Sequence, residues 1–179
     1  MEAHRLNLLV SREEIDSIIK GLARQISEDY RDKDLVLVCI LKGAFMFLSD
    51  LARHLEIPVK IDFVRLASYG SGMKSCGVIE IMKDLELPIE GKDVLIIEDI
   101  VDSGRTLQFL RDRLSLANPR SVKICALLDK KARREVEIEV DYLGKEVDDF
   151  FVVGYGIDFN EDYRHLAEIY YVTPVGHKR

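Results

Sequence analysis

The strongest structural signal in the chain lies at residues 94–106, which read Val-Leu-Ile-Ile-Glu-Asp-Ile-Val-Asp-Ser-Gly-Arg-Thr. An apolar run ends in acidic residues, a polar stretch with one glycine follows, and Leu107, Leu110 and Leu114 then recur at helical spacing. This order predicts a buried strand, a tight loop and the start of a helix. Ligands of open parallel sheets bind at the carboxyl ends of the strands, so this loop is a candidate binding site.

The polar part of this segment carries groups that suit a phosphorylated sugar. Ser103, Gly104 and Thr106 stand at a helix start, where hydroxyls and unpaired backbone N–H groups can bind a phosphate. Glu98 and Asp99 would repel a phosphate, but they can accept hydrogen bonds from sugar hydroxyls or act through a cation. An ordinary capped helix would need only one acid, whereas this segment has three. The pattern therefore indicates a sugar phosphate as ligand.

Length, composition and charge limit the class of protein. The chain has 179 residues, which is enough for one domain with its own core, and we expect a single domain over residues 1–179. Apolar residues make up 47% and charged residues 32%, as in ordinary globular proteins. The net charge of −6 argues against a general nucleic-acid surface, which would need a basic patch. An anionic small substrate remains possible, because a few cationic side chains and magnesium can neutralise it locally.

Neither membrane insertion nor a cysteine framework is indicated. No apolar stretch approaches the length that spans a bilayer, and residues 1–10 lack the order of a signal peptide, so we expect a cytoplasmic protein. Cys39 and Cys125 lie in apolar runs and are predicted to be buried thiols, whereas Cys76 lies in a polar loop. The cysteines imply no disulfide framework, and the four histidines lack metal-ligand spacing, so we expect no structural zinc site.

The order of apolar runs predicts the fold class. Ser11 and Glu14 form a capping-box pattern, and the isoleucines that follow predict a helix of four or five turns. Further expected elements are strands at 35–40, 59–66, 78–82, 122–128, 150–155 and 169–172 and a helix at 45–55. Residues 67–77 predict a flexible loop, and residues 129–149 a mostly exposed charged segment. Strands alternate with helices, which predicts an α/β fold with a mainly parallel, twisted sheet flanked by helices.

Residues 94–106 resemble the phosphoribosyl-diphosphate (PRPP) binding motif of the type I phosphoribosyltransferases. In that motif an apolar strand leads to two acids, two further residues, Asp, then Ser or Thr, Gly and Thr. The resemblance implies the type I phosphoribosyltransferase fold, with a small hood formed by the terminal segments. It also implies that Ser103, Gly104, Arg105 and Thr106 bind the 5′-phosphate, with Arg105 acting through its backbone.

The same resemblance assigns the three acids. Glu98 and Asp99 would bind the ribose hydroxyls of PRPP and would act as ligands of Mg²⁺, the expected cofactor. Asp102 would be the catalytic residue, acting as general base or acid at N7 of a purine.

Two further segments look like known loops of the family. Leu41-Lys42-Gly43-Ala44 follows the first predicted strand and resembles the diphosphate-binding loop, with Lys42 and Gly43 as diphosphate-binding residues. The resemblance implies a cis or strained Leu41–Lys42 peptide, with Lys42 near the diphosphate or a subunit interface. Ser68 and Tyr69 resemble the start of a mobile lid, which would exclude water from a reactive ribosyl centre.

Residues 150–164 resemble the corresponding segment of the 6-oxopurine phosphoribosyltransferases. By this resemblance Phe151 would stack on the purine, and Val152 would read the base edge through its backbone. Asp158 would hold magnesium and Arg164 would bind the diphosphate. Lys130 falls at the position of the lysine that donates to the purine 6-oxygen, and its donor-only ammonium would disfavour the amino group of adenine.

These resemblances imply a magnesium-dependent enzyme of purine salvage. It would transfer the 5-phosphoribosyl group of PRPP to hypoxanthine, guanine or both, releasing diphosphate, and it would form a homodimer or homotetramer. A preference for xanthine remains open, because the contacts to the purine 2-substituent are not evident from the sequence. An RNA-binding regulator of the same fold is the alternative from another class. It would need a basic face, and the one obvious basic cluster comprises Lys130, Lys131, Arg133 and Arg134.

Overall fold

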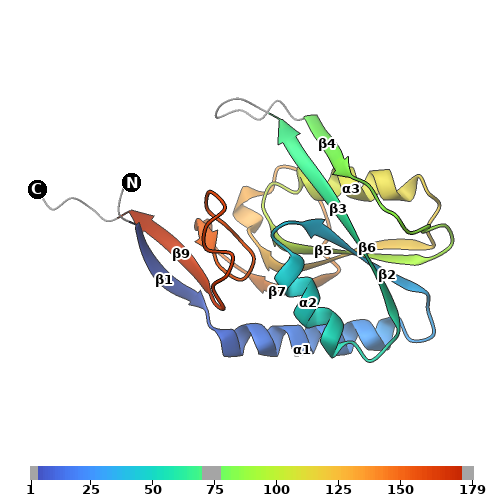
Figure 1. Ribbon diagram of the computed structural model, residues 1–179, viewed down its shortest axis with the longest axis horizontal. Coiled ribbons are helices and arrows are strands. Elements are labelled where there is room, and N and C mark those ends of the chain that lie inside the picture. Colours follow the sequence, from blue (N-terminus) through green and yellow to red (C-terminus); the bar gives the residue numbers. More distant parts are fainter. Residues whose placement is uncertain (1–3, 70–77, 175–179) are drawn as a thin grey trace, which may run out of the picture.

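The computed structural model describes residues 4–69 and 78–174, and it confirms an α/β fold with a mainly parallel sheet (Figure 1). Within these residues the main sheet has six strands in the order β4-β3-β2-β5-β6-β7. The strands are β2 (Leu35–Leu41), β3 (Val59–Tyr69), β4 (Val78–Lys83), β5 (Asp93–Val101), β6 (Ser121–Asp129) and β7 (Tyr142–Glu146). Only β4 pairs antiparallel, so the carboxyl ends of β2, β5 and β6 meet at one edge.

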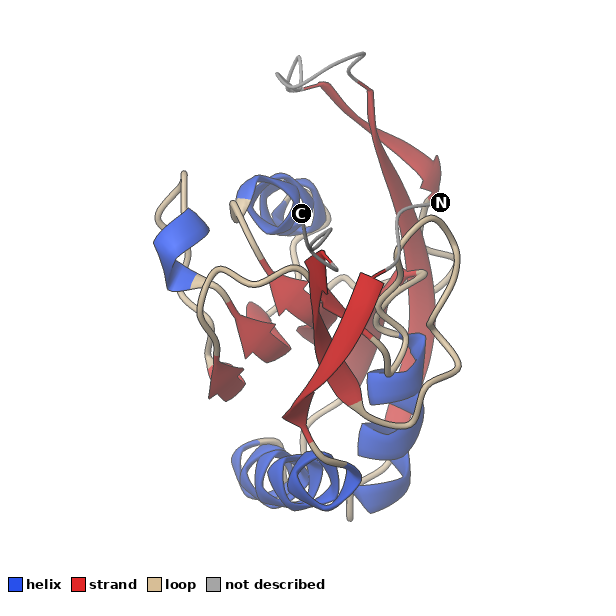
Figure 2. Ribbon diagram, turned by 90° about the vertical axis from the view of Figure 1, so that its left-hand side faces the viewer, coloured by secondary structure: helices blue, strands red, loops and turns tan. Residues whose placement is uncertain are grey.

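Helices cover both faces of this sheet (Figure 2). On one face α1 (Arg12–Asp29) and α2 (Phe45–His54) pack with alternate residues of the central strands, such as Leu37 and Leu95. On the other face α3 (Arg105–Ser115) packs with the intervening residues, such as Val38 and Ile96. Because successive strand residues point to opposite faces, this two-sided burial requires the continuous apolar runs seen in the sequence.

The predicted start of the first helix is confirmed. The backbone N–H of Glu14 donates to Ser11 Oγ at 3.2 Å, as expected for an N-cap. The side chain of Glu14, however, pairs with Lys145 on β7. Ile15, Ile19 and Ile26 are buried along one side of α1, in agreement with the helical spacing of the isoleucines.

The terminal segments form a second, smaller sheet, which is the expected hood. It consists of β1 (His4–Val10), β9 (Ile169–Pro174) and β8 (Val152–Val153), in the order β1-β9-β8 and antiparallel throughout. Figure 1 shows β1 and β9 side by side, away from the main sheet. The strand predicted at 150–155 is therefore shorter than expected and belongs to the hood, because Gly154 and Gly156 have positive φ values of 101° and 98° that end it.

Two sequence predictions are wrong. Residues 129–149 are not merely an exposed segment: they contain a short helical turn, η1 (Lys131–Arg133), and the edge strand β7. Tyr142 on β7 is 2% exposed and donates its hydroxyl to Asp29 at 2.8 Å. The loop predicted from residue 67 also begins later, because β3 pairs with β4 up to Tyr69. Both errors concern strands that are stabilised by distant partners and not by their own apolar pattern.

The described cysteines agree with the prediction. Cys39 on β2 and Cys125 on β6 are buried and free. Burial raises the pKa of Cys39 to about 12 and also raises the pKa of Cys125. Cys76 lies outside the described residues. Among the helices in the described part of the chain, none is long and apolar enough to cross a membrane.

A buried carboxylate joins β3 to the segment between β4 and β5. Asp62 is 4% exposed, and its Oδ2 accepts hydrogen bonds from the backbone N–H groups of Glu86 at 2.7 Å and Leu87 at 2.8 Å. Its Oδ1 accepts from the N–H of Phe63 at 2.7 Å. Burial alone would raise the pKa of Asp62, but these backbone hydrogen bonds hold the pKa below its ordinary value of 3.8.

We expect Asp62→Asn to lower the free energy of unfolding by about 2–4 kcal/mol at neutral pH, because an amide cannot replace a charged acceptor of three N–H groups. The pKa of Asp62 is depressed in the folded state, so its contribution is present above the unfolded pKa and is lost as the pH falls through the folded pKa. Urea denaturation should therefore show a difference from wild type that shrinks below about pH 4.

Asp84→Asn is the matched control, because Asp84 is exposed and pairs with Arg113 at 3.0 Å on the surface. It should change the free energy of unfolding by less than about 1 kcal/mol. Equal effects of the two substitutions would contradict the role given to Asp62.

Candidate active site

The loop at 101–104 turns the chain sharply from β5 into α3. Gly104 has φ 82° and ψ −10°, the left-handed region that favours glycine. A Cβ at this position would lie 3.0–3.2 Å from side-chain atoms of Arg134, Val136 and Ile138. A glycine is therefore needed both for the turn and for the close approach of the segment after η1.

Most of the residues predicted to bind a sugar phosphate line one cavity of about 180 Å³ at the start of α3. They are Glu98, Asp102, Ser103, Gly104 and Thr106, joined by Ile100, Val101 and Leu107. The first backbone N–H groups of a helix lack partners within the helix, so this end of α3 can bind an anion. Arg105 does not line the cavity, and its side chain pairs with Glu135 at 2.6 Å.

The two acids at the end of β5 are held in an environment that disfavours their charge. Burial raises the pKa of Glu98, and the neighbouring Asp99 carboxylate raises it further. Burial also raises the pKa of Asp99 to about 6, although Asp99 Oδ1 accepts a hydrogen bond from the N–H of Ile100 at 2.8 Å. Glu98 Oε2 is buried and has no hydrogen-bond partner in the structure. An oxygen of this kind fits a cation or a hydroxyl donor.

The donor set around these acids limits how a metal could bind. Among residues 4–69 and 78–174 no cluster of three or more His, Cys, Asp or Glu side chains forms a metal site by itself. Magnesium usually takes one or two carboxylates and completes its shell with water and substrate phosphates. Glu98 and Asp99 therefore fit a magnesium ion that is shared with a substrate, and they do not resemble a permanent metal cage.

The loop after β2 lies directly against these acids. The Leu41–Lys42 peptide is cis, which confirms the prediction for this bond. A Cβ on Gly43 would lie 1.8 Å from Asp99 Oδ2, so any other residue here would force the Asp99 carboxylate to move. On the other side, a Cβ on Gly156 would lie 2.1 Å from the carbonyl oxygen of Gly43. The loop after β2 thus meets the segment after β8 backbone to backbone, and the Asp99 side chain of β5 fills the space beside Gly43.

An ion-pair network connects the loop after β2 to the segment after β8. Arg164 Nη2 lies 2.8 Å from Asp158 Oδ1, and Arg164 Nη1 donates to the carbonyl oxygen of Gly156 at 2.8 Å. Glu161 pairs with Lys42 at 2.9 Å and with Arg164 at 3.3 Å. The structure therefore brings together Lys42, Asp158 and Arg164 as predicted, and it adds Glu161, which the sequence did not single out.

On the opposite side of the phosphate loop, η1 places a buried lysine near Asp102. Lys130 is 7% exposed, and its backbone N–H donates to the carbonyl oxygen of Val101 at 2.9 Å. Burial lowers the pKa of Lys130, and the Asp102 carboxylate opposes this shift. Arg133 lies 3.5 Å from Asp102 Oδ2 and 2.8 Å from Asp149 Oδ1. Sequence reasoning treated Arg133 only as part of a basic cluster and missed this position.

Two of the three residues predicted for the purine, Phe151 and Val152, lie at the hood, whereas Lys130 lies next to η1. Phe151 is 52% exposed and meets Phe159 edge-on at 5.1 Å between ring centroids. Val152 is buried in β8, where the strand pairs with β9. The predicted lid residues Ser68 and Tyr69 end β3 and pair with β4 through their backbones. The rest of that predicted loop, residues 70–77, lies outside the described part of the chain.

The basic cluster that an RNA-binding function would need is not a free basic face. Lys131 pairs with Glu146 at 2.6 Å, and Arg134 pairs with the buried Asp129 at 2.5 Å. Arg133 is paired as described above, and Lys130 is buried. Asp129, Glu146 and Asp149 thus neutralise most of the positive charge of this cluster.

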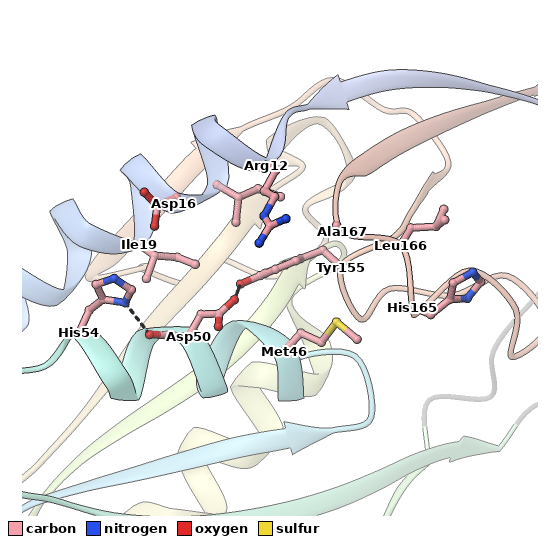
Figure 3. A pocket seen from close by; sticks show the side chains of 11 residues that line it. Arg12, Asp16, Ile19, Met46, Asp50, His54, Tyr155, His165, Leu166 and Ala167 are labelled. Carbon is pink, nitrogen blue, oxygen red and sulfur yellow. Dashed lines mark hydrogen bonds between the residues drawn. The ribbon is translucent and has the colours of Figure 1, made fainter.

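A cavity of about 400 Å³ lies between α1, α2 and residues 155–167 (Figure 3). Tyr155 points into it and donates its hydroxyl to Asp50 on α2, which ties the segment that carries Asp158 to that helix. Arg12 from α1 and His165 also line this cavity. None of the residues predicted for the active site does, so we place the candidate active site at the carboxyl ends of β2, β5 and β6.

Known proteins share both this sequence and this fold. The family model of the phosphoribosyl transferase domain matches residues 11–160. A hypoxanthine phosphoribosyltransferase of Escherichia coli is 49% identical over 168 residues, which cover 93% of this chain and 94% of that protein. A hypoxanthine-guanine phosphoribosyltransferase of Aquifex aeolicus is 46% identical over 169 residues, which cover 94% of this chain and 95% of that protein.

A solved structure agrees with the sequence relatives. The crystal structure of a hypoxanthine phosphoribosyltransferase from Staphylococcus aureus superposes with a TM-score of 0.91 at 45% identity. The match covers 94% of this chain and 91% of that one. The domain match, the identity and the shared fold all extend over most of the chain, and they show that this protein belongs to the phosphoribosyl transferase domain family.

Proposed function

We propose that this protein transfers the 5-phosphoribosyl group of PRPP to hypoxanthine, guanine or both, and releases IMP or GMP and diphosphate. One observation carries the proposal: three features lie together at one edge of the sheet. They are the cavity at the start of α3, the half-buried acids Glu98 and Asp99, and the buried Lys130. The named activities of relatives that are 46–49% identical over most of the chain support it.

In this proposal the phosphate loop and the acids of β5 hold the sugar. Backbone N–H groups and hydroxyls of residues 103–106 bind the 5′-phosphate. Glu98 and Asp99 accept hydrogen bonds from the ribose hydroxyls and, when ionised, stabilise the positive charge that develops on the ribose. Lys42, Gly43 and Arg164 bind the diphosphate.

Magnesium, held by Asp158, Glu98 and Asp99 together with the substrate, would supply positive charge to the leaving diphosphate. Glu98 Oε2, buried without a hydrogen-bond partner in the structure, supports this assignment for the β5 acids. The purine would stack on Phe151, be read by the backbone of Val152, and receive a hydrogen bond from Lys130 at its 6-oxygen.

The reaction exchanges one bond at C1 of the ribose for another. The bond from C1 to the diphosphate oxygen breaks, and purine N9 forms a bond to C1 while the proton on N7 passes to Asp102. Holding both substrates at one edge of the sheet removes much of the entropic barrier. Ser68 and Tyr69 would begin the lid that keeps water away from C1.

The choice of base, the assembly and the location of the protein also belong to the proposal. A preference for xanthine would depend on contacts to the purine 2-substituent, and the assay below includes xanthine for this reason. Self-association into a dimer or tetramer and a cytoplasmic location are likewise proposed from the sequence. RNA binding is disfavoured, because the basic cluster near η1 is neutralised by acids.

The direct test is an assay of nucleotide formation. The protein is mixed with PRPP and magnesium, and hypoxanthine, guanine, xanthine or adenine is supplied separately. We expect product with hypoxanthine or guanine and none with adenine. Absence of nucleotide with both hypoxanthine and guanine would refute the proposal.

We expect Asp102→Asn to lower kcat by about 10²–10⁴-fold, because the variant cannot accept the N7 proton. The Kd for PRPP, measured by calorimetry, should change little. Asp112→Asn is the control, since Asp112 is exposed on α3 and contacts Gln108 at 2.7 Å, outside the site. Full activity of Asp102→Asn would exclude the catalytic role.

We expect Lys130→Met to lower kcat/KM for hypoxanthine by about 10–100-fold, the equivalent of one hydrogen bond to a charged donor. Its neighbour Lys131 provides the control, because Lys131 is exposed and pairs with Glu146. Lys131→Met should leave kcat/KM nearly unchanged. The reverse result would assign purine recognition to Lys131.

A further inference from the structure

The two cations assigned to the diphosphate already have an anionic partner within the chain. Lys42 Nζ contacts both carboxylate oxygens of Glu161, at 3.0 Å and 2.9 Å. Arg164 Nη2 contacts the same carboxylate at 3.3 Å. A carboxylate that binds two cations through two oxygens makes the contacts that the oxygens of a phosphate group would make.

The remaining contacts of Arg164 do not depend on Glu161. Asp158 Oδ1 and the carbonyl oxygen of Gly156 hold the guanidinium at 2.8 Å each. Arg164 Nε is buried without a hydrogen-bond partner in the structure. The guanidinium would therefore stay in place if Glu161 left, and Nη2, still paired with Asp158, would have its second N–H available for another acceptor.

The side chain of Glu161 can move away from Lys42 and Arg164 while its backbone stays in place. Its side chain is 65% exposed, whereas that of Arg164 is only 20% exposed. Its backbone N–H donates to Asp158 Oδ2 at 2.8 Å, which anchors the turn at this residue. Its φ of 68° lies in the left-handed region, which residues other than glycine rarely adopt. Hydrogen bonds from Lys42 and Arg164 keep the pKa of Glu161 below its ordinary value, so the group is an anion at neutral pH.

From this geometry we propose that Glu161 is an internal counter-ion, which occupies the diphosphate-binding cations in the ligand-free protein and is displaced when diphosphate binds. The inference rests on the proposed function and deepens it, because it names a residue that sets the affinity of the same site. Diphosphate can bind only to molecules in which Glu161 has left the two cations. The apparent Kd therefore equals the intrinsic Kd divided by the fraction of molecules in that open state. Glu161 is a positioning residue in this scheme, since it orients Lys42 and Arg164 and does not touch the reacting atoms.

The test compares Glu161→Gln with wild type in calorimetric titrations of magnesium diphosphate and in steady-state kinetics with PRPP and hypoxanthine. Exposed ion pairs are individually weak, and two of them are removed, so we expect Kd for diphosphate and KM for PRPP to fall about three- to tenfold. We expect kcat to stay the same or fall, because tighter diphosphate also leaves more slowly. A loss of loop structure would instead raise both constants.

Glu86→Gln is the matched control. Glu86 forms an exposed ion pair with Lys83 at 3.0 Å, beside β4 and away from the site, so the same substitution there should leave Kd and KM unchanged. Glu161→Ala removes the carboxylate in a different way and should tighten binding to a similar extent. Thermal unfolding of each variant shows whether the chain remains folded.

The outcomes separate this inference from the proposed function. If wild type binds magnesium diphosphate and forms nucleotide, but both Glu161 variants bind diphosphate equally or more weakly, the counter-ion role is refuted and the proposed function stands. If wild type neither binds magnesium diphosphate nor forms nucleotide, both proposals are wrong. Tighter binding by both variants, with Glu86→Gln unchanged, supports the role given to Glu161.

Discussion

The candidate active site depends on a steric constraint at Gly43. On one side of this residue the Asp99 carboxylate fills the position that a Cβ would take, and on the other side a Cβ on Gly156 would lie 2.1 Å from its carbonyl oxygen. A side chain on Gly156 would meet backbone, and one on Gly43 would displace the Asp99 carboxylate, so these two glycines let the end of β2 lie close to β5 and to the segment after β8. This packing holds the acids of β5 beside Lys42 and the Asp158–Arg164 pair, although the three segments are far apart in sequence.

The constraint also shapes the electrostatics of the site. Packing against Gly43 and the neighbouring loops removes water from Glu98 and Asp99, and this desolvation raises the pKa of both carboxyl groups. The charge of Arg164 lowers the pKa of Asp99 but does not offset the burial, and the Asp158 carboxylate raises it. Lys42 and Arg164 are already paired with Glu161 and Asp158. The ligand-free site thus holds more carboxylates than cations. A diphosphate that arrives together with magnesium brings positive charge for the carboxylates and an anion for Lys42 and Arg164.

The sequence was informative where one local pattern sufficed. Residues 94–106 specified a strand, a loop and a helix start, and the structure has β5, Gly104 in a left-handed turn, and α3. Local patterns failed where a distant partner stabilises the element. Strand β7 contains a glycine and charged residues, and it exists because it pairs with β6 and buries Tyr142.

The same limit applies to the site. Arg133 and Glu161 are common surface residue types, and only tertiary contacts place them beside Asp102 and Lys42. The cis Leu41–Lys42 peptide was expected only because of a family resemblance, since nothing in the local composition requires it. Phe151 was identified in the same way, and its side chain is 52% exposed at the hood.

The buried thiols of the central strands have a practical consequence. Cys39 and Cys125 sit on β2 and β6, on either side of β5, and burial keeps both in the unreactive protonated form. An alkylating reagent can modify them only in molecules whose sheet has opened. Mass-spectrometric detection of label at these two positions would therefore report directly on global unfolding under native conditions, without any engineered probe.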